Sequence, residues 1–221
     1  VLNGANADKL LVVARESGET TAKEGISVFI VDARNEGVEI QSYTNVDGKN
    51  AAKITLTSVN ISVDSRLGAA GKALPGLESG IDRATLAVCA EAVGSLEALL
   101  KKTVEYSKIR KQFGTPIGTF QALQHRMADM FIECQLARSI VIMAAMSLDS
   151  NDSDAEKSKA VSAAKSRIGK AIRKVGQESI QIHGGIGVTN ELDISHLFKS
   201  VTALDVMFGN SDYHTKRFSS L

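Results

Sequence analysis

The 221-residue sequence lacks tryptophan and contains only two cysteines and two prolines. Cys89 and Cys134 stand far apart inside apolar patterns, without the close spacing of zinc ligands or of a disulfide framework. The sequence therefore gives no sign of a disulfide-stabilised secreted domain or of a structural zinc site. We expect a protein of a reducing compartment, the cytoplasm.

An excess of charge of one sign is also missing, because 26 lysines and arginines face 25 aspartates and glutamates, for a net charge of +1. Such a balance gives no long-range attraction to nucleic acid or to an anionic membrane. The longest apolar run, residues 140–146, is too short to span a bilayer. The first residues lack the charged and then apolar layout of a signal peptide. We expect neither a nucleic-acid nor a membrane partner.

The first part of the sequence, residues 1–70, has the pattern of β-strands. Four short runs rich in β-branched residues recur between glycine-containing turns: "KLLVVAR", "GISVFIVD", "GVEIQSY" and "AAKITLTSVNI". The last run alternates in polarity, which predicts that Ile54, Leu56 and Val59 share the buried face of a strand. These runs predict an antiparallel β-domain that the chain enters partway through.

Residues 71–221 change to the period of helices. In residues 120–148 apolar or small residues recur at alternating three- and four-residue steps, and residues 81–106 and 155–182 form two more long amphipathic segments. With a shorter C-terminal helix they predict a four-helix bundle, in which Gly94, Gly169 and Gly176 would permit close helix approach. The fold class is therefore α+β: a partial antiparallel β-domain followed by an all-α four-helix bundle.

Two segments carry residues suited to binding an anionic, partly aromatic ligand. "RKQFGTPIGTFQ" joins two helices and offers the guanidinium of Arg110, the amide of Gln112 and the ring of Phe113. "QIHGGIGVTNE" ends a helix at Gly184 and Gly185, where backbone N–H groups can approach an anion. Taken alone, the first is more typical of a solvated loop with a buried phenylalanine, and the second of a helix C-cap.

Asp82 precedes Arg83 near the start of the first long helix, where a carboxylate also suits the helix dipole without any catalytic role. The four histidines show no metal-ligand spacing, so each is read as a packing or surface residue: His125, His183, His196 and His214.

Taken together, four motifs resemble one family. "VLNGANADKLLVVAR", "GIDRATLAVCAEAVG", "YSKIRKQFGTPIGTFQALQHRMADM" and "QIHGGIGVTNE" have the order and rough spacing of the second half of a flavin-dependent acyl-CoA dehydrogenase. "AVCAEAVG" and the "MFGN" turn before "DYHTKR" are most similar to the small-subunit type of bacterial pimeloyl-CoA dehydrogenase. The resemblance implies the later strands of a middle β-domain and the whole C-terminal bundle. We expect a fragment without the N-terminal helical domain, inactive by itself.

The resemblance also implies a cofactor, FAD, and its contacts. Arg110, Gln112 and Phe113 match residues that meet the adenosine diphosphate half of FAD, and Gln181, Gly184 and Gly185 match those that line it from the other side. The implied partners are an acyl-CoA substrate, a homotetramer or a heterotetramer with a second dehydrogenase subunit, and an electron-transfer flavoprotein.

The resemblance leaves the catalytic base in question. In many members a glutamate in a loop after the Gly-Gly turn removes the α-proton of the thioester, but Phe208 stands at the aligned position and cannot accept a proton. A second branch has its base at the start of the first bundle helix, which matches Asp82, one methylene shorter than glutamate, followed by Arg83 as a substrate-binding residue. Two functions remain open: a catalytic acyl-CoA dehydrogenase subunit that uses Asp82, or a non-catalytic partner subunit of a heteromeric dehydrogenase.

Overall fold

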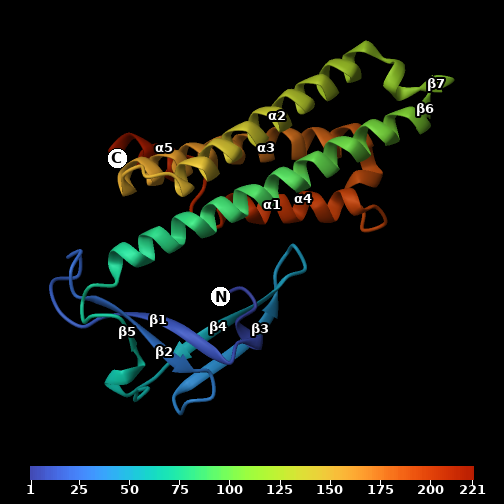
Figure 1. Ribbon diagram of the computed structural model, residues 1–221. Coiled ribbons are helices and arrows are strands. Elements are labelled where there is room, and N and C mark those ends of the chain that lie inside the picture. The colour runs from blue at the N-terminus through green and yellow to red at the C-terminus, as the bar shows by residue number, and fades with distance from the viewer. The chain divides into compact units, whose positions relative to one another are not determined.

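The computed structural model describes all residues, 1–221, and divides them into two compact units, Val1–Gly80 and Ile81–Leu221. The first unit holds β1 to β5 and the second holds the helical bundle, as the ribbon in Figure 1 shows. Each unit is described by itself.

The first unit contains two small antiparallel sheets. One has the order β1-β2-β5, with β1 at Lys9–Arg15, β2 at Ile26–Asp32 and β5 at Arg66–Leu67. The other pairs β3, Val38–Thr44, with β4, Asn50–Leu56. Two short 3-10 helices, η1 at Gly4–Asn6 and η2 at Val63–Ser65, complete the unit. The four predicted strands are confirmed, whereas β5 is too short to show a pattern in the sequence.

The predicted buried face of the last long strand is only partly correct. β4 ends at Leu56, which is 42% exposed, and Val59 lies beyond the strand. Ala51 and Ala52 are the buried residues of β4. Their small side chains carry a weak hydrophobic signal, so the alternation of larger residues misled the prediction.

The second unit is a helical bundle followed by one more helix. Its long elements are α1, Leu74–Ile109, which starts in the first unit, α2, Gln121–Asp149, and α3, Asp154–His183. A hairpin of β6, Lys111–Gln112, and β7, Thr115–Pro116, with η3 at Ile117–Thr119, joins α1 to α2. After α3 come η4 at Gly184–Val188, α4 at Asp193–Val206 and α5 at Ser211–Ser220. The predicted four-helix bundle is confirmed in α1 to α4, and α5 is an addition that the prediction did not contain.

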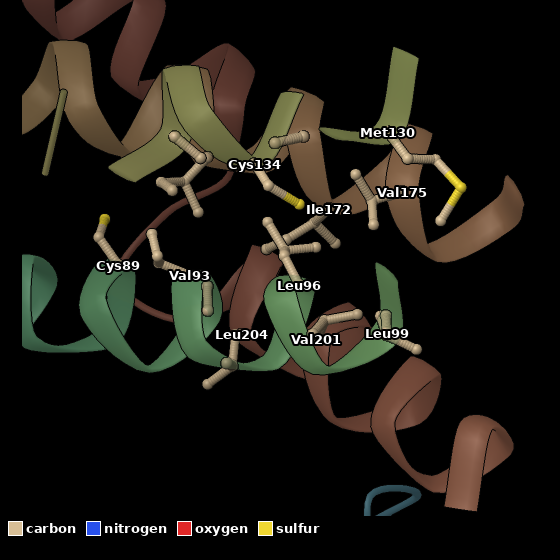
Figure 2. Close-up of a cluster of buried hydrophobic side chains, with 14 of the residues drawn as sticks. Cys89, Val93, Leu96, Leu99, Met130, Cys134, Ile172, Val175, Val201 and Leu204 are labelled. Carbon is tan, nitrogen blue, oxygen red and sulfur yellow. The ribbon is translucent and has the colours of Figure 1, made fainter. Parts of the chain in front are cut away.

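The core of the bundle lies where the predicted seam of α2 meets its neighbours. Met130, Cys134 and Ala137 on that seam are at most 1% exposed, and Figure 2 shows Met130 and Cys134 among side chains of α1, α3 and α4. The three- and four-residue spacing puts them on one helix face, so the sequence pattern was sufficient to find this part of the core. Both cysteines are free, and burial raises the pKa of each thiol to about 12.

Two of the three helix glycines lie at close helix contacts. A Cβ on Gly169 would lie 2.4 Å from Oδ1 of Asp205 on α4, and one on Gly176 would lie 3.1 Å from the ring of Phe198. A Cβ on Gly94 would meet nothing within 4 Å in this chain. The prediction is therefore confirmed for Gly169 and Gly176, and Gly94 has no such neighbour here.

The outer face of α2 is apolar. By length and composition, α2 is long and apolar enough to cross a membrane. The longest uninterrupted apolar run in the sequence does not reveal this property. Only 22% of the most apolar window of α2 is buried in the chain. Its charged residues Glu133 and Arg138 pair with Arg167 of α3 and Glu97 of α1, as expected of a bundle helix. The large apolar side chains left exposed on α2, here called the α2 face, are Phe131, Ile132, Leu136, Ile142, Met143 and Met146.

Candidate functional site

The six residues predicted to contact the cofactor line one cavity at the end of the bundle. It lies where the end of α1, the β6–β7 hairpin, the start of α2 and the end of α3 meet, and its volume is about 390 Å³. We call it the Arg110 cavity. Its predicted lining residues are Arg110, Gln112, Phe113, Gln181, Gly184 and Gly185. Residues more than sixty positions apart in the chain thus come together at one hollow.

The hairpin presents Phe113 to solvent. Phe113 has a left-handed backbone conformation, φ 54°, at the tip of the two-residue turn, and Gly114 follows with φ 81°. The Ile117 N–H donates to the Arg110 carbonyl at 2.8 Å and closes the base of the hairpin. Phe113 is 93% exposed and meets the ring of Phe120 edge to face, with 6.3 Å between the ring centroids. The alternative of a buried phenylalanine is therefore wrong, and an aromatic face remains available to a ligand.

The glycine turn opposite the hairpin is open. Gly184 has φ 68°, and its N–H donates to the carbonyls of Ile180 and Gln181, so it is the C-cap that the alternative interpretation expected. A Cβ built on Gly184 or Gly185 would meet no atom within 4 Å. The turn therefore both ends α3 and leaves its backbone accessible beside the cavity.

Tyr106 and His183 form one wall of the cavity and were not among the predicted site residues. Their rings stack with centroids 4.3 Å apart, and the Tyr106 hydroxyl donates to the His183 carbonyl at 3.4 Å. His183 Nδ1 lies 2.8 Å from the Ser179 carbonyl, which can only accept, so this nitrogen carries the hydrogen. Burial lowers the pKa of His183, which keeps the ring neutral at neutral pH. Tyr106 precedes Arg110 by one helical turn, a spacing that could have identified it.

Charge in the Arg110 cavity is positive and partly uncompensated. Arg126 pairs with Glu178 through its Nε at 2.5 Å, whereas Arg110 forms no ion pair within the chain. An unpaired guanidinium, the amides of Gln112 and Gln181 and an open glycine backbone are the donors that a diphosphate requires, and Phe113 suits a flat ring. The residues present fit the adenosine diphosphate half of FAD.

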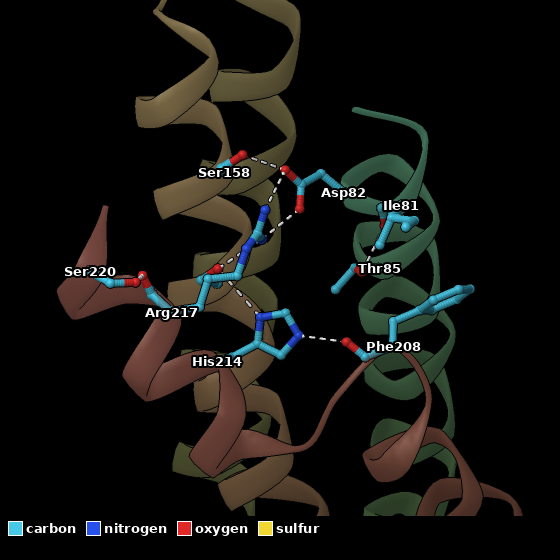
Figure 3. A network of polar contacts seen from close by, with 9 residues as sticks. Ile81, Asp82, Thr85, Ser158, Phe208, His214, Arg217 and Ser220 are labelled. Atoms are coloured by element: carbon cyan, nitrogen blue, oxygen red, sulfur yellow. Dashed lines mark hydrogen bonds and ion pairs between the residues drawn. The ribbon is translucent and has the colours of Figure 1, made fainter. Parts of the chain in front are cut away.

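Asp82 lies elsewhere, inside the bundle. Its side chain is 4% exposed and accepts from both terminal nitrogens of Arg217, at 2.6 and 3.1 Å, and from the Ser158 hydroxyl at 2.5 Å. Figure 3 shows this carboxylate between α1 and the helices that carry Ser158 and Arg217. Arg83, one residue on, is exposed and turned to another side of α1. The structure does not bring Asp82 or Arg83 to the Arg110 cavity.

The loop that carries Phe208, residues 207–210, joins α4 to α5. Phe208 has φ 55° and Gly209 φ 100°, which no helix accommodates, and the Asn210 side chain accepts from the Tyr213 N–H to start α5. The Phe208 side chain is 42% exposed, and its carbonyl lies 2.9 Å from Nε2 of the buried His214.

Comparisons with known proteins find matches to one family. Residues 77–219 match the family described as "Acyl-CoA dehydrogenase, C-terminal domain". The chain is 31% identical over 215 residues to the probable acyl-CoA dehydrogenase YngJ of Bacillus subtilis (strain 168), covering 96% of this chain and 56% of that protein. It is 45% identical over 120 residues to the acyl-CoA dehydrogenase IpdE2 of Mycolicibacterium smegmatis (strain ATCC 700084 / mc(2)155), covering 53% of this chain and 35% of that protein.

A solved structure extends the similarity to almost every residue. Butyryl-CoA dehydrogenase from Megasphaera elsdenii matches with a TM-score of 0.90 and 25% identity, over 99% of this chain and 57% of that one. The chain thus spans about half the length of the curated relatives it matches over most of its own length.

Proposed function

The chain belongs to the acyl-CoA dehydrogenase family, and from that premise we propose that it forms part of a flavin-dependent enzyme that dehydrogenates an acyl-CoA thioester between its α and β carbons. Members of the family are FAD-dependent oxidoreductases. Because the chain spans about half of its relatives, the activity belongs to the protein of which these residues form a part.

The observation that carries the proposal is the meeting of two distant motifs at the Arg110 cavity. There Arg110 would neutralise a phosphate, the amides of Gln112 and Gln181 would donate to its oxygens, and Phe113 would stack on a ring. The open backbone at Gly184 would let the ligand approach closely. When bound, FAD would supply the acceptor for a hydride.

The origin of the base decides between the two candidate functions. As a base, Asp82 would have to leave Arg217 and Ser158, which together occupy both of its oxygens. Removing one partner of a buried ion pair leaves the other charge uncompensated, at a cost of about 3–5 kcal/mol. Phe208 offers no acid in its place. The geometry therefore favours the partner-subunit function, in which this chain completes a nucleotide site and a second subunit supplies the carboxylate.

The apolar α2 face supports an oligomer, as this proposal requires. Six large apolar side chains on one helix face, each at least 49% exposed, are typical of a surface covered by another protein chain. We propose that a neighbouring subunit of the dehydrogenase covers it. An electron-transfer flavoprotein is the proposed acceptor of the electrons.

The test of the proposed function uses the complete gene product purified with any co-encoded dehydrogenase subunit. We expect bound flavin in the absorbance spectrum, and bleaching when an acyl-CoA is added without oxygen. A matched pair of variants, Asp82→Asn here and the loop glutamate to glutamine in the second subunit, then assigns the base. Loss of bleaching only in the second subunit's variant supports the partner function, loss only in Asp82→Asn supports Asp82 as base, and a flavin-free complex contradicts both.

A further inference from the structure

We propose that His214 is a positioning residue that fixes the backbone of the 207–210 loop. In this proposal Asp82 acts through Arg217 and Ser162 to hold the neutral His214 ring with its hydrogen on Nε2. The groups involved, here called the Asp82 network, connect α1, α3 and α5 to the loop (Figure 3). That this loop borders the acyl-CoA site, as its alignment with the base-bearing loop of the family implies, rests on the proposed function, whereas its anchoring by His214 does not.

The hydrogen bonds of the Asp82 network have a fixed direction. The Phe208 carbonyl can only accept, so the hydrogen of a neutral His214 lies on Nε2, 2.9 Å away. His214 Nδ1 must then accept, and the Ser162 hydroxyl lies 3.4 Å from it. Arg217 can only donate, and its Nη1 lies 3.1 Å from the Ser162 oxygen, which leaves the Ser162 hydrogen for His214.

Asp82 lies at the other end of this series of hydrogen bonds. Its carboxylate holds both terminal nitrogens of Arg217, and so it fixes the guanidinium plane from which Nη1 reaches Ser162. Asp82, Ser162 and His214 are each at most 3% exposed, so water does not compete for these bonds. A carboxylate buried on α1 thus orients a ring on α5 through two intermediates.

The loop is also tethered at its edges. Lys165, which is fully buried, donates to the carbonyls of Leu204 and Asp205 in the last turn of α4, at 2.9 and 2.7 Å. Arg173 donates to the Ser211 hydroxyl at 2.7 Å, where α5 begins. Between these anchors, His214 is the side chain that reaches the loop's own backbone.

The hydrogen bond from His214 holds the loop in its observed shape, although Phe208 at the tip of the loop has no carboxylate. Phe208 holds an uncommon left-handed conformation for a bulky residue, which persists only when its surroundings impose it. The carbonyl faces the buried His214, while the side chain stays 42% exposed. His214 thereby fixes where the Phe208 ring stands, and with it the shape of whatever surface the loop presents to an acyl chain.

The test compares two substitutions of similar size by hydrogen exchange and mass spectrometry on the complete protein that contains these residues. In His214→Gln the amide nitrogen replaces Nε2 and keeps the donor to Phe208, whereas in His214→Asn the amide reaches only as far as Nδ1. We expect the glutamine variant to keep the wild-type exchange rate over residues 207–210. The asparagine variant is expected to exchange about tenfold faster there. The η4 turn, residues 184–188, serves as the internal reference and is expected to stay unchanged.

A third variant tests the role of Ser162, and two outcomes would contradict the proposal. Ser162→Ala, which leaves His214 in place but removes the relay, is expected to raise exchange over residues 207–210 several-fold; this variant replaces His214→Asn if the latter does not fold. Equal exchange in all variants and wild type, or a uniform rise over the whole bundle, would overturn the proposal. Because no readout involves flavin, a negative result here is distinct from a failure of the proposed function.

Discussion

Single buried polar residues hold much of the helical unit in place. Lys165, Asp82 and His214 are each at most 3% exposed, and each is bonded to a charged or backbone group on another element. A buried polar group without a partner costs about 1–3 kcal/mol, so these residues specify which helix faces meet as well as stabilising the contact. Composition could not reveal the bonds of Lys165 and Asp82, because their partners lie 39 to 135 positions away in the chain.

The two buried histidines predict a stability that falls on mild acidification. Burial lowers the pKa of both His183 and His214 below the usual 6.5, and for His214 the nearby charges of Lys165 and Arg217 lower it further, against the opposing effects of the hydrogen bond to the Phe208 carbonyl and of Asp82. The unfolded chain therefore binds more protons than the folded chain below about pH 6.5. Stability is fully present above that pH and is lost as the pH falls through the folded-state pKa values.

The expected slope is at most about 1.4 kcal/mol per pH unit for each histidine. Urea unfolding of the chain between about pH 7.5 and about pH 5.5 measures it, with His214→Gln as the matched variant. The variant should lose part of the slope because it cannot titrate. An unchanged slope in the variant would show that His214 does not contribute.

At the scale of the elements, the junction of α4 and α5 is the feature that the sequence predicts least well. The three- and four-residue pattern of residues 120–148 identified α2 and its buried face almost completely, because helix period and burial coincide there. Residues 207–210 contain no proline, and the only glycine follows a phenylalanine whose left-handed conformation is imposed by distant side chains. Local propensity could not predict a break that tertiary contacts create.

The candidate site, too, could be predicted from the sequence only in part. Its six predicted residues were identified by family resemblance and meet at one cavity, although spacing in the sequence gives no sign that the hairpin and the glycine turn are neighbours. Tyr106 was visible as a residue one turn before Arg110. The pairing of Asp82 with Arg217 was not, because 135 residues separate them.

Two glycines give opposite predictions for the same substitution. A Cβ on Gly209, at φ 100°, would lie 2.4 Å from the Tyr213 ring, so Gly209→Ala is expected to destabilise the chain by roughly 1–3 kcal/mol. Gly94 sits inside α1 with open space around it, so Gly94→Ala is expected to stabilise by about 0.5–1 kcal/mol. Urea unfolding of both variants is the measurement. A stabilising Gly209→Ala would show that the loop does not need its left-handed conformation.

At the scale of the whole molecule, the α2 face predicts association. Met143→Lys places a charge on this face, which a contact with another subunit would have to bury, and we expect the dissociation constant of the oligomer to rise at least about tenfold. Sedimentation velocity over a range of concentrations measures this. Val46→Lys, at a residue 74% exposed in the first unit, is the control and should leave association unchanged. Equal sedimentation of wild type and Met143→Lys would exclude this face as the interface.

The central claim is that the Arg110 cavity binds a nucleotide diphosphate, and calorimetric titration of the assembled complete protein, stripped of flavin, with ADP tests it most directly. We predict saturable binding that weakens at least about tenfold in Arg110→Ala, because a charge-assisted bond to phosphate is lost. Arg34→Ala, at an exposed arginine of the first unit, should bind as wild type does. Undiminished ADP binding by Arg110→Ala, or no binding by the wild-type protein, would contradict the claim.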